Sequence, residues 1–390
     1  MKHLLPLALS FAAGCTAPDL EPDYGRPLPP GAPALLPLDP GEPRPNMEST
    51  WVERADVLPA LERSMKWTRG EYSREFFPIA GISHAHALAS LERFHELLTS
   101  ARSAVEFEQA VQAEFEFFKS AGWDGRGGGV LFTGYCTPIL PGRAQPDGEY
   151  RYALYALPPD LVKAPDGTIL GQETPTGVRP YPTRRVIEAS GHLTGKDLEL
   201  VWLRDPLDAF IAHVNGSAFV ELPDGSLFRL GYAGKNGREY TSLGAELIAD
   251  GLIEADGMSL AAIRRWSAEN PGRVEEYLAR NDSFVFFTPI EGNPRGSLNL
   301  EVQTERTLAT DKRLFPRGAM VFVDARGPLA SGGRGVFRKL LFDQDTGGAI
   351  RTAGRADVYL GIGPEAEARA GATRAEGQMY YLFQRRGPSP

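Results

Sequence analysis

Two aspartates and a glycine pair near the carboxyl end are the residues of this sequence best suited to chemistry. Asp345 follows an apolar run at 340–342 and precedes Gly347 and Gly348, and Asp357 begins a second apolar run. A glycine pair lets the backbone turn sharply and lets a bulky ligand approach the main chain. An aspartate at the end of such a strand is placed for proton transfer to a large substrate. The alternative is an Asx-type turn, in which the aspartate only bonds its own backbone.

Further motifs along the chain favour the first interpretation. In chain order they are TGYCTP at 133–138, VWLRDPLDAFIAHVNGSA at 201–218, LGYAGKNGREYTSLG at 230–244, PRGSLNLEVQTERTLATD at 294–311 and QDTGGAI at 344–350. In these segments, and in their order, the chain resembles the membrane-bound lytic murein transglycosylase A family. The resemblance covers roughly residues 130–390. Several ordered motifs over such a length are far more specific than one short motif.

The resemblance implies a fold that is mainly β with helices. In this fold a double-psi β-barrel domain is interrupted by a second β-barrel-like domain, and the substrate groove lies between the two. The corresponding expected segments are a signal peptide at 1–14, a proline-rich linker at 15–49, the catalytic barrel with its early helices at 50–132 and 281–390, and the inserted substrate-binding domain at 133–280.

The residue pattern agrees with this order of β, α and β regions. Short strands broken by Gly, Pro and Asp turns are predicted from 129 to 240, and another set of strands from 283 to 383. Helical segments are predicted between them at 244–252, 259–269 and 271–280.

Apolar residues at helical spacing predict two helices within residues 87–121. Ser103 and Glu106 have the spacing of a capping box at the start of the second helix, and Gly122 is expected to end it. Phe115 and Phe118 then belong to the core and do not form a platform for a sugar.

The same resemblance implies an enzyme that works with one carboxylate, Asp345, and without metal or cofactor. Ordinary glycosidases use a pair of carboxylates. In lytic cleavage the N-acetylmuramic acid ring supplies its own C6 hydroxyl as nucleophile, and intramolecular attack gains from a high effective molarity. Asp345 would protonate the bond oxygen and then accept the C6 hydroxyl proton, leaving a 1,6-anhydro end. Its pKa must therefore be raised by burial or by a nearby carboxylate. We expect Asp357 to be a helper, and Asp343 is given no role.

Two other functions stay open on the sequence. One is a catalytically inactive peptidoglycan-binding lipoprotein of the same fold, because a fold alone does not settle function. It is conceivable because Cys136 and Thr137 replace the family's tyrosine and glutamate. The other is a hydrolase that uses water. The retained Asp-Thr-Gly-Gly sequence at 345–348 favours the lytic enzyme.

Several hydroxyl, amide and aromatic side chains match family positions and suit the binding of N-acetyl sugars. Together with Gly347 and Gly348, these expected substrate-binding residues are Thr133, Tyr135, Asn215, Ser217, Tyr232, Lys235, Asn236, Tyr240 and Ser242. For any one of them a packing or turn role is an equal alternative. Asn215 and Ala218 replace the family's glutamine and glycine, which puts the details of the subsites in doubt.

Two other sets of reactive residues are not predicted to form sites. Cys136 lacks the nearby histidine signature of a thiol enzyme, so we expect a small residue that lines a groove. His84 and His86 lack a third ligand at helical or hairpin spacing, so no zinc site is predicted.

The first residues resemble the export signal of a bacterial lipoprotein. Lys2 and His3 precede an apolar stretch at 4–13, which ends in small residues before Cys15. In this interpretation Cys15 becomes the lipidated first residue, and Thr16 after it directs the protein to the outer membrane, facing the periplasm. An ordinary secretory signal is the alternative. The prolines that follow predict an extended, semi-rigid linker.

Composition limits the classes of partner. The chain has 390 residues, of which 24% are charged and 42% hydrophobic, and its net charge is −8. This balance suits a globular protein with a large core and argues against nucleic acid, whose phosphates require basic surfaces. No apolar run approaches the length of a transmembrane helix. We expect peptidoglycan glycan strands and, through Cys15, outer-membrane lipid as partners of a monomer.

Overall fold

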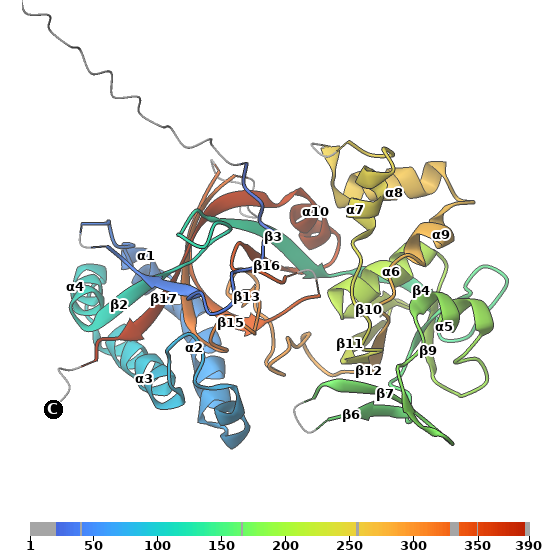
Figure 1. The fold of residues 1–390 in the computed structure, drawn as a ribbon, viewed down its shortest axis with the longest axis horizontal. Coiled ribbons are helices and arrows are strands. Elements are labelled where there is room, and N and C mark those ends of the chain that lie inside the picture. Colours follow the sequence, from blue (N-terminus) through green and yellow to red (C-terminus); the bar gives the residue numbers. More distant parts are fainter. Residues whose placement is uncertain are drawn as a thin grey trace, which may run out of the picture.

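The computed structural model describes residues 21–39, 41–164, 167–254, 257–327, 335–348 and 350–386. Cys15 and the expected signal peptide lie outside these residues. Within them the chain forms two β-rich halves, one carrying the amino- and carboxyl-terminal segments and the other the middle of the chain (Figure 1).

Strands from both ends of the chain form the first sheet, and several of them carry continuous apolar runs that are buried on both faces. They are β1 (Leu35–Pro37), β2 (Phe115–Ser120), β3 (Val130–Thr137), β13 (Thr307–Ala309), β14 (Met320–Arg326), β15 (Val336–Asp345), β16 (Arg355–Ile362) and β17 (Arg374–Gln384). Their order is β1-β2-β17-β14-β15-β13-β16-β3, and β17 also pairs with β3. The sheet therefore closes from β17 round to β3 as a barrel, filled by side chains such as Leu308, Val358 and Tyr381.

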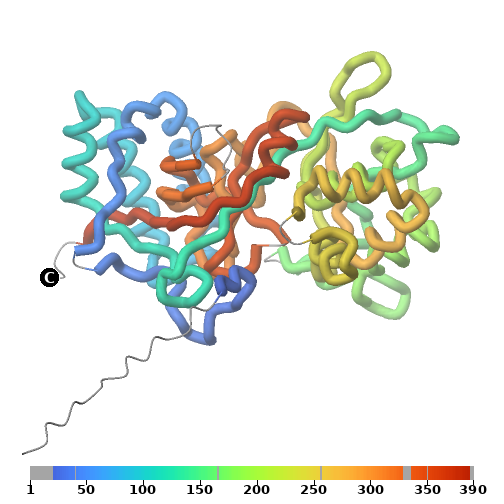
Figure 2. The backbone as a smooth tube through the Cα atoms, turned by 90° about the horizontal axis from the view of Figure 1, so that it is seen from above, coloured from blue at the N-terminus to red at the C-terminus, as the bar shows by residue number. Residues whose placement is uncertain are grey.

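Amino-terminal helices cover one side of this barrel (Figure 2). They are α1 (Glu48–Val52), α2 (Arg54–Arg69), the 3-10 turn η1 (Glu71–Phe76), α3 (His84–Ser100) and α4 (Ala104–Glu114), while α10 (Pro364–Ala372) packs on β3 and β16. A second apolar cluster joins the helices to the strands, with Leu61 and Phe94 against Leu340 and Phe342. Successive residues of β15 thus face the barrel interior and the helices in turn.

The second half is built around a mixed sheet in the order β12-β11-β10-β4-β9-β5, with a separate three-stranded sheet β6-β7-β8. Its strands are β4 (Ile139–Arg143), β5 (Tyr152–Tyr155), β6 (Leu161–Lys163), β7 (Ile169–Thr174), β8 (Gly177–Arg179), β9 (Glu199–Leu203), β10 (Ala218–Glu221), β11 (Leu227–Lys235) and β12 (Val285–Pro289). Its helices are α5 (Arg184–Ser190), α6 (Pro206–Asn215), α7 (Leu243–Ala249), α8 (Leu260–Glu269) and α9 (Val274–Leu278). We call this half the inserted domain, since barrel strands lie on both sides of it in the sequence.

The expected boundary at residue 133 falls inside β3. This strand pairs with β16 from Leu131 to Thr137 and so belongs to the barrel over its whole length. The boundary at 280 precedes β12, which pairs with β11 in the inserted domain. β3 and the segment after β12 therefore connect the two halves.

The expected linker at 15–49 is wrong for its described residues, which pack against the barrel. Leu35 to Pro37 pair with β2, and Ala34 and Leu35 are buried in the barrel cluster. Farther upstream, the Tyr24 carbonyl accepts a hydrogen bond from the Thr352 hydroxyl. Prolines tolerate edge-strand positions, so their density did not prevent folding.

The second predicted early helix is also shorter than expected. Ser103 caps α4 as predicted by accepting a hydrogen bond from the Glu106 amide, but the helix ends at Glu114 and not at Gly122. Residues Phe115–Ser120 form β2, which pairs with β17. Phe115 is nevertheless fully buried, as expected of a core residue.

The helices predicted at 244–252, 259–269 and 271–280 correspond to α7, α8 and α9, and the strand predicted from Phe284 to β12. Sequence patterns missed α1, α2, α5, α6 and α10. Among the helices of the described part, none combines the length and hydropathy needed to cross a bilayer.

Candidate active site

A β-bulge in β15 gives Asp343 and Asp345 different surroundings. Leu308 of β13 pairs with Asp343, but the next residue, Ala309, pairs with Asp345, so Gln344 is the extra residue. In a regular strand Asp343 and Asp345 would point to the same side. The bulge instead keeps Asp343 in the barrel interior and turns Asp345 away from it, as bulges next to active sites commonly do.

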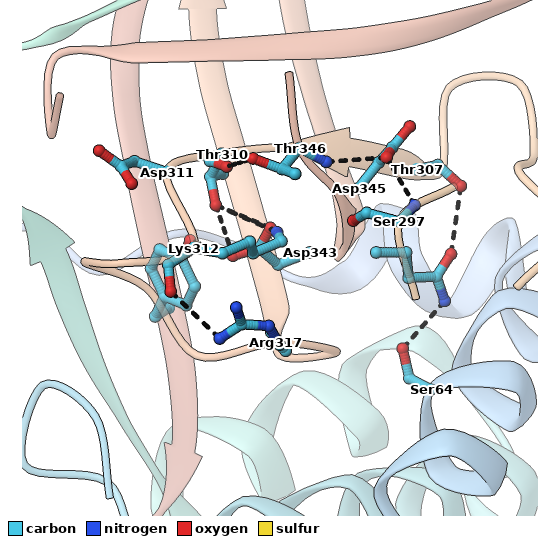
Figure 3. Close-up of polar contacts among 12 residues, drawn as sticks. Ser64, Ser297, Thr307, Thr310, Asp311, Lys312, Arg317, Asp343, Asp345 and Thr346 are labelled. Atoms are coloured by element: carbon cyan, nitrogen blue, oxygen red, sulfur yellow. Dashed lines mark hydrogen bonds and ion pairs between the residues drawn. The ribbon is translucent and has the colours of Figure 1, made fainter. Parts of the chain in front are cut away.

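Asp345 is partly exposed, and three donors fix its carboxylate. The amides of Ser297 and Thr346 each donate to Oδ1 at 2.8 Å (Figure 3). The Tyr135 hydroxyl donates to Oδ2 at 2.7 Å. Gly296 allows the close approach, because a Cβ there would lie 2.9 Å from the Asp345 Cγ. Burial raises the pKa of Asp345 above its ordinary value, against the lowering effect of these donors and of Lys312.

Asp357 lies two strands away on the same face. Ala309 is the register partner of both Asp345 and Asp357, so the two acids flank this one residue of β13. Adjacent strands are about 4.8 Å apart, which places the two backbones roughly 10 Å from each other. The Thr133 hydroxyl donates to Asp357 Oδ1, and an Arg355 nitrogen lies 3.7 Å from the same oxygen.

The structure therefore brings four predicted residues together across three barrel strands. Thr133 and Tyr135 come from β3, Asp345 from β15 and Asp357 from β16. Burial and the neighbouring charge of Asp345 raise the pKa of Tyr135 well above its ordinary value, so this phenol stays a hydrogen-bond donor.

The glycine turn after Asp345 meets the inserted domain at Tyr240. A Cβ at Gly348 would lie 3.1 Å from the Tyr240 Cβ, so a larger residue would need this ring to move. The turn is held by Arg351, whose Nε donates to the Gly348 carbonyl at 3.0 Å. Burial and the positive charge of Arg351 lower the pKa of Lys235, which places this lysine of the inserted domain near the turn.

Tyr232 is the most exposed of the predicted binding residues in the inserted domain, at 49%. It lies on β11, where its ring packs beside Gly216. Among the described residues, the side chains of Tyr232 and Lys235 have no hydrogen-bond partner, whereas the Tyr240 hydroxyl bonds the Ser242 side chain.

Four other predicted binding residues use their polar atoms within the protein. The Asn215 amide group bonds the Cys136 amide and the Ile211 carbonyl. Ser217 is buried against the Thr137 hydroxyl at 3.1 Å. Ser242 caps α7 by accepting from the Ala245 amide.

Asn236 is the clearest example of a predicted binding residue that uses its polar atoms within the protein. Its Nδ2 donates to the carbonyls of Pro182 and Asp282, and its Oδ1 accepts from the amides of Phe284 and Arg238. With its side chain buried and every donor used, Asn236 has the packing role that the sequence left open as an alternative.

Cys136 is buried, and burial raises its pKa to about 12, so it stays a thiol at neutral pH. The His84 ring bonds Ser73 and the Thr68 carbonyl, and the His86 ring bonds the Gln384 carbonyl. Over the residues that the structure describes, His, Cys, Asp and Glu form no group of three suited to a metal ion.

Sequence patterns did not identify the buried polar residues next to Asp345 in β15, which are Asp343 and Gln344. Asp343 is fully buried and forms an ion pair with Lys312, 31 residues away. Gln344, also buried, ties the bulge to α2 by donating to the Ala60 carbonyl and the Ser64 hydroxyl. The only local signal was a run of two acids and an amide in a strand that is otherwise apolar.

Two family profiles match the chain. One, described as the MltA specific insert domain, matches residues 131–288, and the other, described as the 3D domain, matches residues 306–383. The first corresponds to the inserted domain with β3, and the second to the barrel strands from β13 to β17.

Curated relatives agree with these profiles. The chain is 35% identical to a membrane-bound lytic murein transglycosylase A of Vibrio cholerae over 67% of each chain. It is 34% identical to the protein of the same name from Escherichia coli K12, over 65% of this chain and 66% of that one.

Solved structures have the same overall fold. A membrane-bound lytic murein transglycosylase from Agrobacterium tumefaciens superposes with a TM-score of 0.76 at 26% identity, covering 90% of this chain and 98% of the other. A structure of E. coli MltA with bound chitohexaose superposes with a TM-score of 0.65 at 26% identity, covering 94% and 97%.

Proposed function

The chain belongs to the membrane-bound lytic murein transglycosylase A family, and from this premise we propose that it cleaves peptidoglycan glycan strands without using water. The bond that breaks is the β-1,4 bond between N-acetylmuramic acid and N-acetylglucosamine. The relatives of this chain carry the name of an enzyme that acts on murein, and the chain has the aspartate and glycine turn that the proposed chemistry uses.

In this proposal Asp345 is the single general acid and base. Its Oδ1 is held by two amide donors, which favours the proton on Oδ2. Asp345 gives that proton to the glycosidic oxygen as the bond to C1 breaks. The carboxylate then takes the proton of the muramic C6 hydroxyl as O6 bonds to C1, which leaves a 1,6-anhydromuramic end and returns the acid to its starting state.

The observation that carries the proposal is the environment of Asp345. It is accessible, it is fixed by three donors, and burial raises its pKa, as an acid that works near neutral pH requires. Asp357 is held by Thr133 and Arg355 and so suits a helper better than a second acid.

We place the glycan in a groove between the barrel, with double-psi topology, and the inserted domain. The contact of Gly348 with Tyr240 supports this placement, because the acid's turn meets the inserted domain there. Tyr232, Lys235 and Tyr240 would contact the sugars, as would Thr133 and Tyr135 beside the acid. The E. coli relative was crystallised with chitohexaose, an N-acetylglucosamine oligomer, which agrees with a glycan ligand.

Mass spectrometry of digested murein tests this function. The proposal predicts 1,6-anhydromuramic ends with the wild-type protein and none with Asp345→Asn. Reducing ends would identify a hydrolase instead. Murein binding without any cleavage would support the alternative of an inactive peptidoglycan-binding lipoprotein.

We also propose that Cys15 carries lipid and holds the protein at the outer membrane, facing the periplasm. The described residues contact the barrel from Tyr24 onward, so the stretch of sequence between Cys15 and the barrel is shorter than the linker to residue 49 that the prolines predicted. Cys15→Ala should release the protein into the soluble fraction, and persistence of this variant in the outer-membrane fraction would contradict the anchor.

A further inference from the structure

Asp343 lies inside the barrel directly behind the acid, and it is fully buried (Figure 3). The Lys312 ammonium donates to its Oδ1, the Tyr381 hydroxyl donates to its Oδ2 at 2.7 Å, and the Thr310 hydroxyl lies 2.8 Å from both oxygens. Donors to both oxygens favour the ionised form of a carboxylate. Asp343 therefore has the contacts of a buried anion, and no path by which it could touch a glycan.

Among the residues that the structure describes, Lys312 is the cation bonded to Asp343, and it also acts on the acid. Its positive charge lowers the pKa of Asp345, while burial raises it. Burial lowers the pKa of Lys312 itself, and the negative charge of Asp345 opposes that effect. A lysine this close to a general acid would, without a counter-ion, favour loss of the acid's proton.

The other charged and titratable groups around the two residues are few. Arg317 and Asp311, on the loop after β13, face Lys312 with opposite effects on it, and Arg317 also donates to the Lys312 carbonyl at 3.1 Å. Tyr381 of β17 faces Asp343. On the open side, Tyr135 faces Asp345, and the charge of Asp357 acts on Tyr135.

We propose that Asp343 is the counter-ion that shields the Asp345 carboxyl from the buried charge of Lys312, so that Asp343 and Lys312 are positioning residues for the reaction. This inference rests on the proposed role of Asp345 as the acid. A paired Lys312 contributes little net charge at Asp345, whereas an unpaired one would stabilise the carboxylate form at the moment when a proton is needed.

The pair has a mechanical role as well. Lys312 Nζ lies 3.2 Å from the Thr310 hydroxyl, and the Thr310 amide donates to the Asp345 carbonyl at 3.1 Å. The loop from Thr310 is thus fastened both to the pair and to the backbone of the acid. A purely mechanical role would affect stability and rate but would not move a pH profile in opposite directions for the two partners.

The pH dependence of kcat on purified murein separates these roles. A general acid is active while protonated, so the alkaline limb of the profile follows its pKa. Asp343→Asn should move this limb to lower pH by roughly one unit, which is a tenfold loss on the alkaline side. Lys312→Met should move it to higher pH, and the double variant should return it close to the wild-type position.

The control is Asp208→Asn, which breaks another partly buried pair, with Arg264, away from the acid. It should leave the limb where it is. If Asp343→Asn does not fold, Lys312→Met and the double variant still test the inference. Shifts of the alkaline limb in the same direction in Asp343→Asn and Lys312→Met would overturn the inference. So would a limb that does not move to higher pH in Lys312→Met, or that does not return close to the wild-type position in the double variant. Activity in Asp345→Asn would instead overturn the proposed function.

Discussion

The barrel face that carries Asp345 and the inserted domain opposite it use their polar side chains in different ways. On the barrel, polar groups from separate strands converge: Tyr135 bonds Asp345, and Thr133 bonds Asp357. In the inserted domain, several of the polar residues expected to bind substrate, Asn215, Ser217, Asn236 and Ser242, are instead bonded to groups of the protein itself. Asn236, with four such bonds, is the extreme case.

This difference indicates that the barrel must hold its reacting groups rigidly, whereas the inserted domain must keep the shape of the surface expected to bind substrate. The barrel holds its acid through three donors and a bulge, which suits a group that must be positioned to within a fraction of an ångström. The inserted domain offers two side chains without a hydrogen-bond partner among the described residues, Tyr232 and Lys235, on a well-packed frame. Substitutions in the barrel should therefore affect kcat, and those in the inserted domain either KM or stability.

The largest effect is expected at Asp345. Asp345→Asn keeps the size of the side chain and one oxygen that can accept hydrogen bonds, but it has no carboxyl proton to transfer. We expect kcat on purified murein to fall at least roughly 10²-fold while murein sedimentation with the protein is unchanged. The matched control is Asp324→Asn on β14, where the aspartate pairs with Arg338 at the surface, and it should keep full activity. Activity of Asp345→Asn above about a tenth of wild type would remove Asp345 as the acid.

A smaller effect is expected at Tyr135. Its hydroxyl donates to the ionised form of Asp345 and so lowers the pKa of this acid. Tyr135→Phe should raise that pKa and move the alkaline limb of kcat to higher pH, by roughly one unit. Tyr359→Phe is the control, because the Tyr359 hydroxyl lies beside Thr137 instead. A limb that moves to lower pH in Tyr135→Phe would contradict the assigned hydrogen bond.

The smallest effects on chemistry are expected in the inserted domain. Lys235→Met should raise KM for murein several-fold with kcat nearly unchanged, since it removes a binding group and no reacting one. Asn236→Ala should instead lower the free energy of unfolding by about 2 kcal/mol or more, because buried backbone groups lose their partners. Thermal unfolding and steady-state kinetics on both variants check this contrast. A fall in kcat for Lys235→Met without a rise in KM would contradict this contrast.

The sequence predicted the parts of the fold that depend on local signals. The Ser103 cap, the three helices after residue 243 and the strand from Phe284 all follow from spacing between near neighbours. Residues 115–118 were misread, because phenylalanines three apart fit a helix as well as a strand whose pairing with β17 cannot be seen locally.

The candidate site likewise contains residues that sequence motifs predicted and residues that they did not. Asp345, Asp357, Thr133 and Tyr135 were found through motifs, and the structure brings them together across three strands. The pairing of Asp343 with Lys312 was not found, because it depends on a bulge set by the register with β13. Among the expected binding residues, motif matches could not separate the residues whose polar atoms bond other groups of the protein from the residues whose polar atoms do not.

The central claim is that the barrel raises the pKa of Asp345 enough to keep it an acid. Titration of the protein with 13C-labelled aspartate side chains, followed by NMR, measures this directly, with the Asp345 signal assigned by its absence in Asp345→Asn. We predict a carboxyl that titrates clearly above the ordinary aspartate value of about 3.9. An Asp345 that titrates at or below that value in the folded protein would contradict the account.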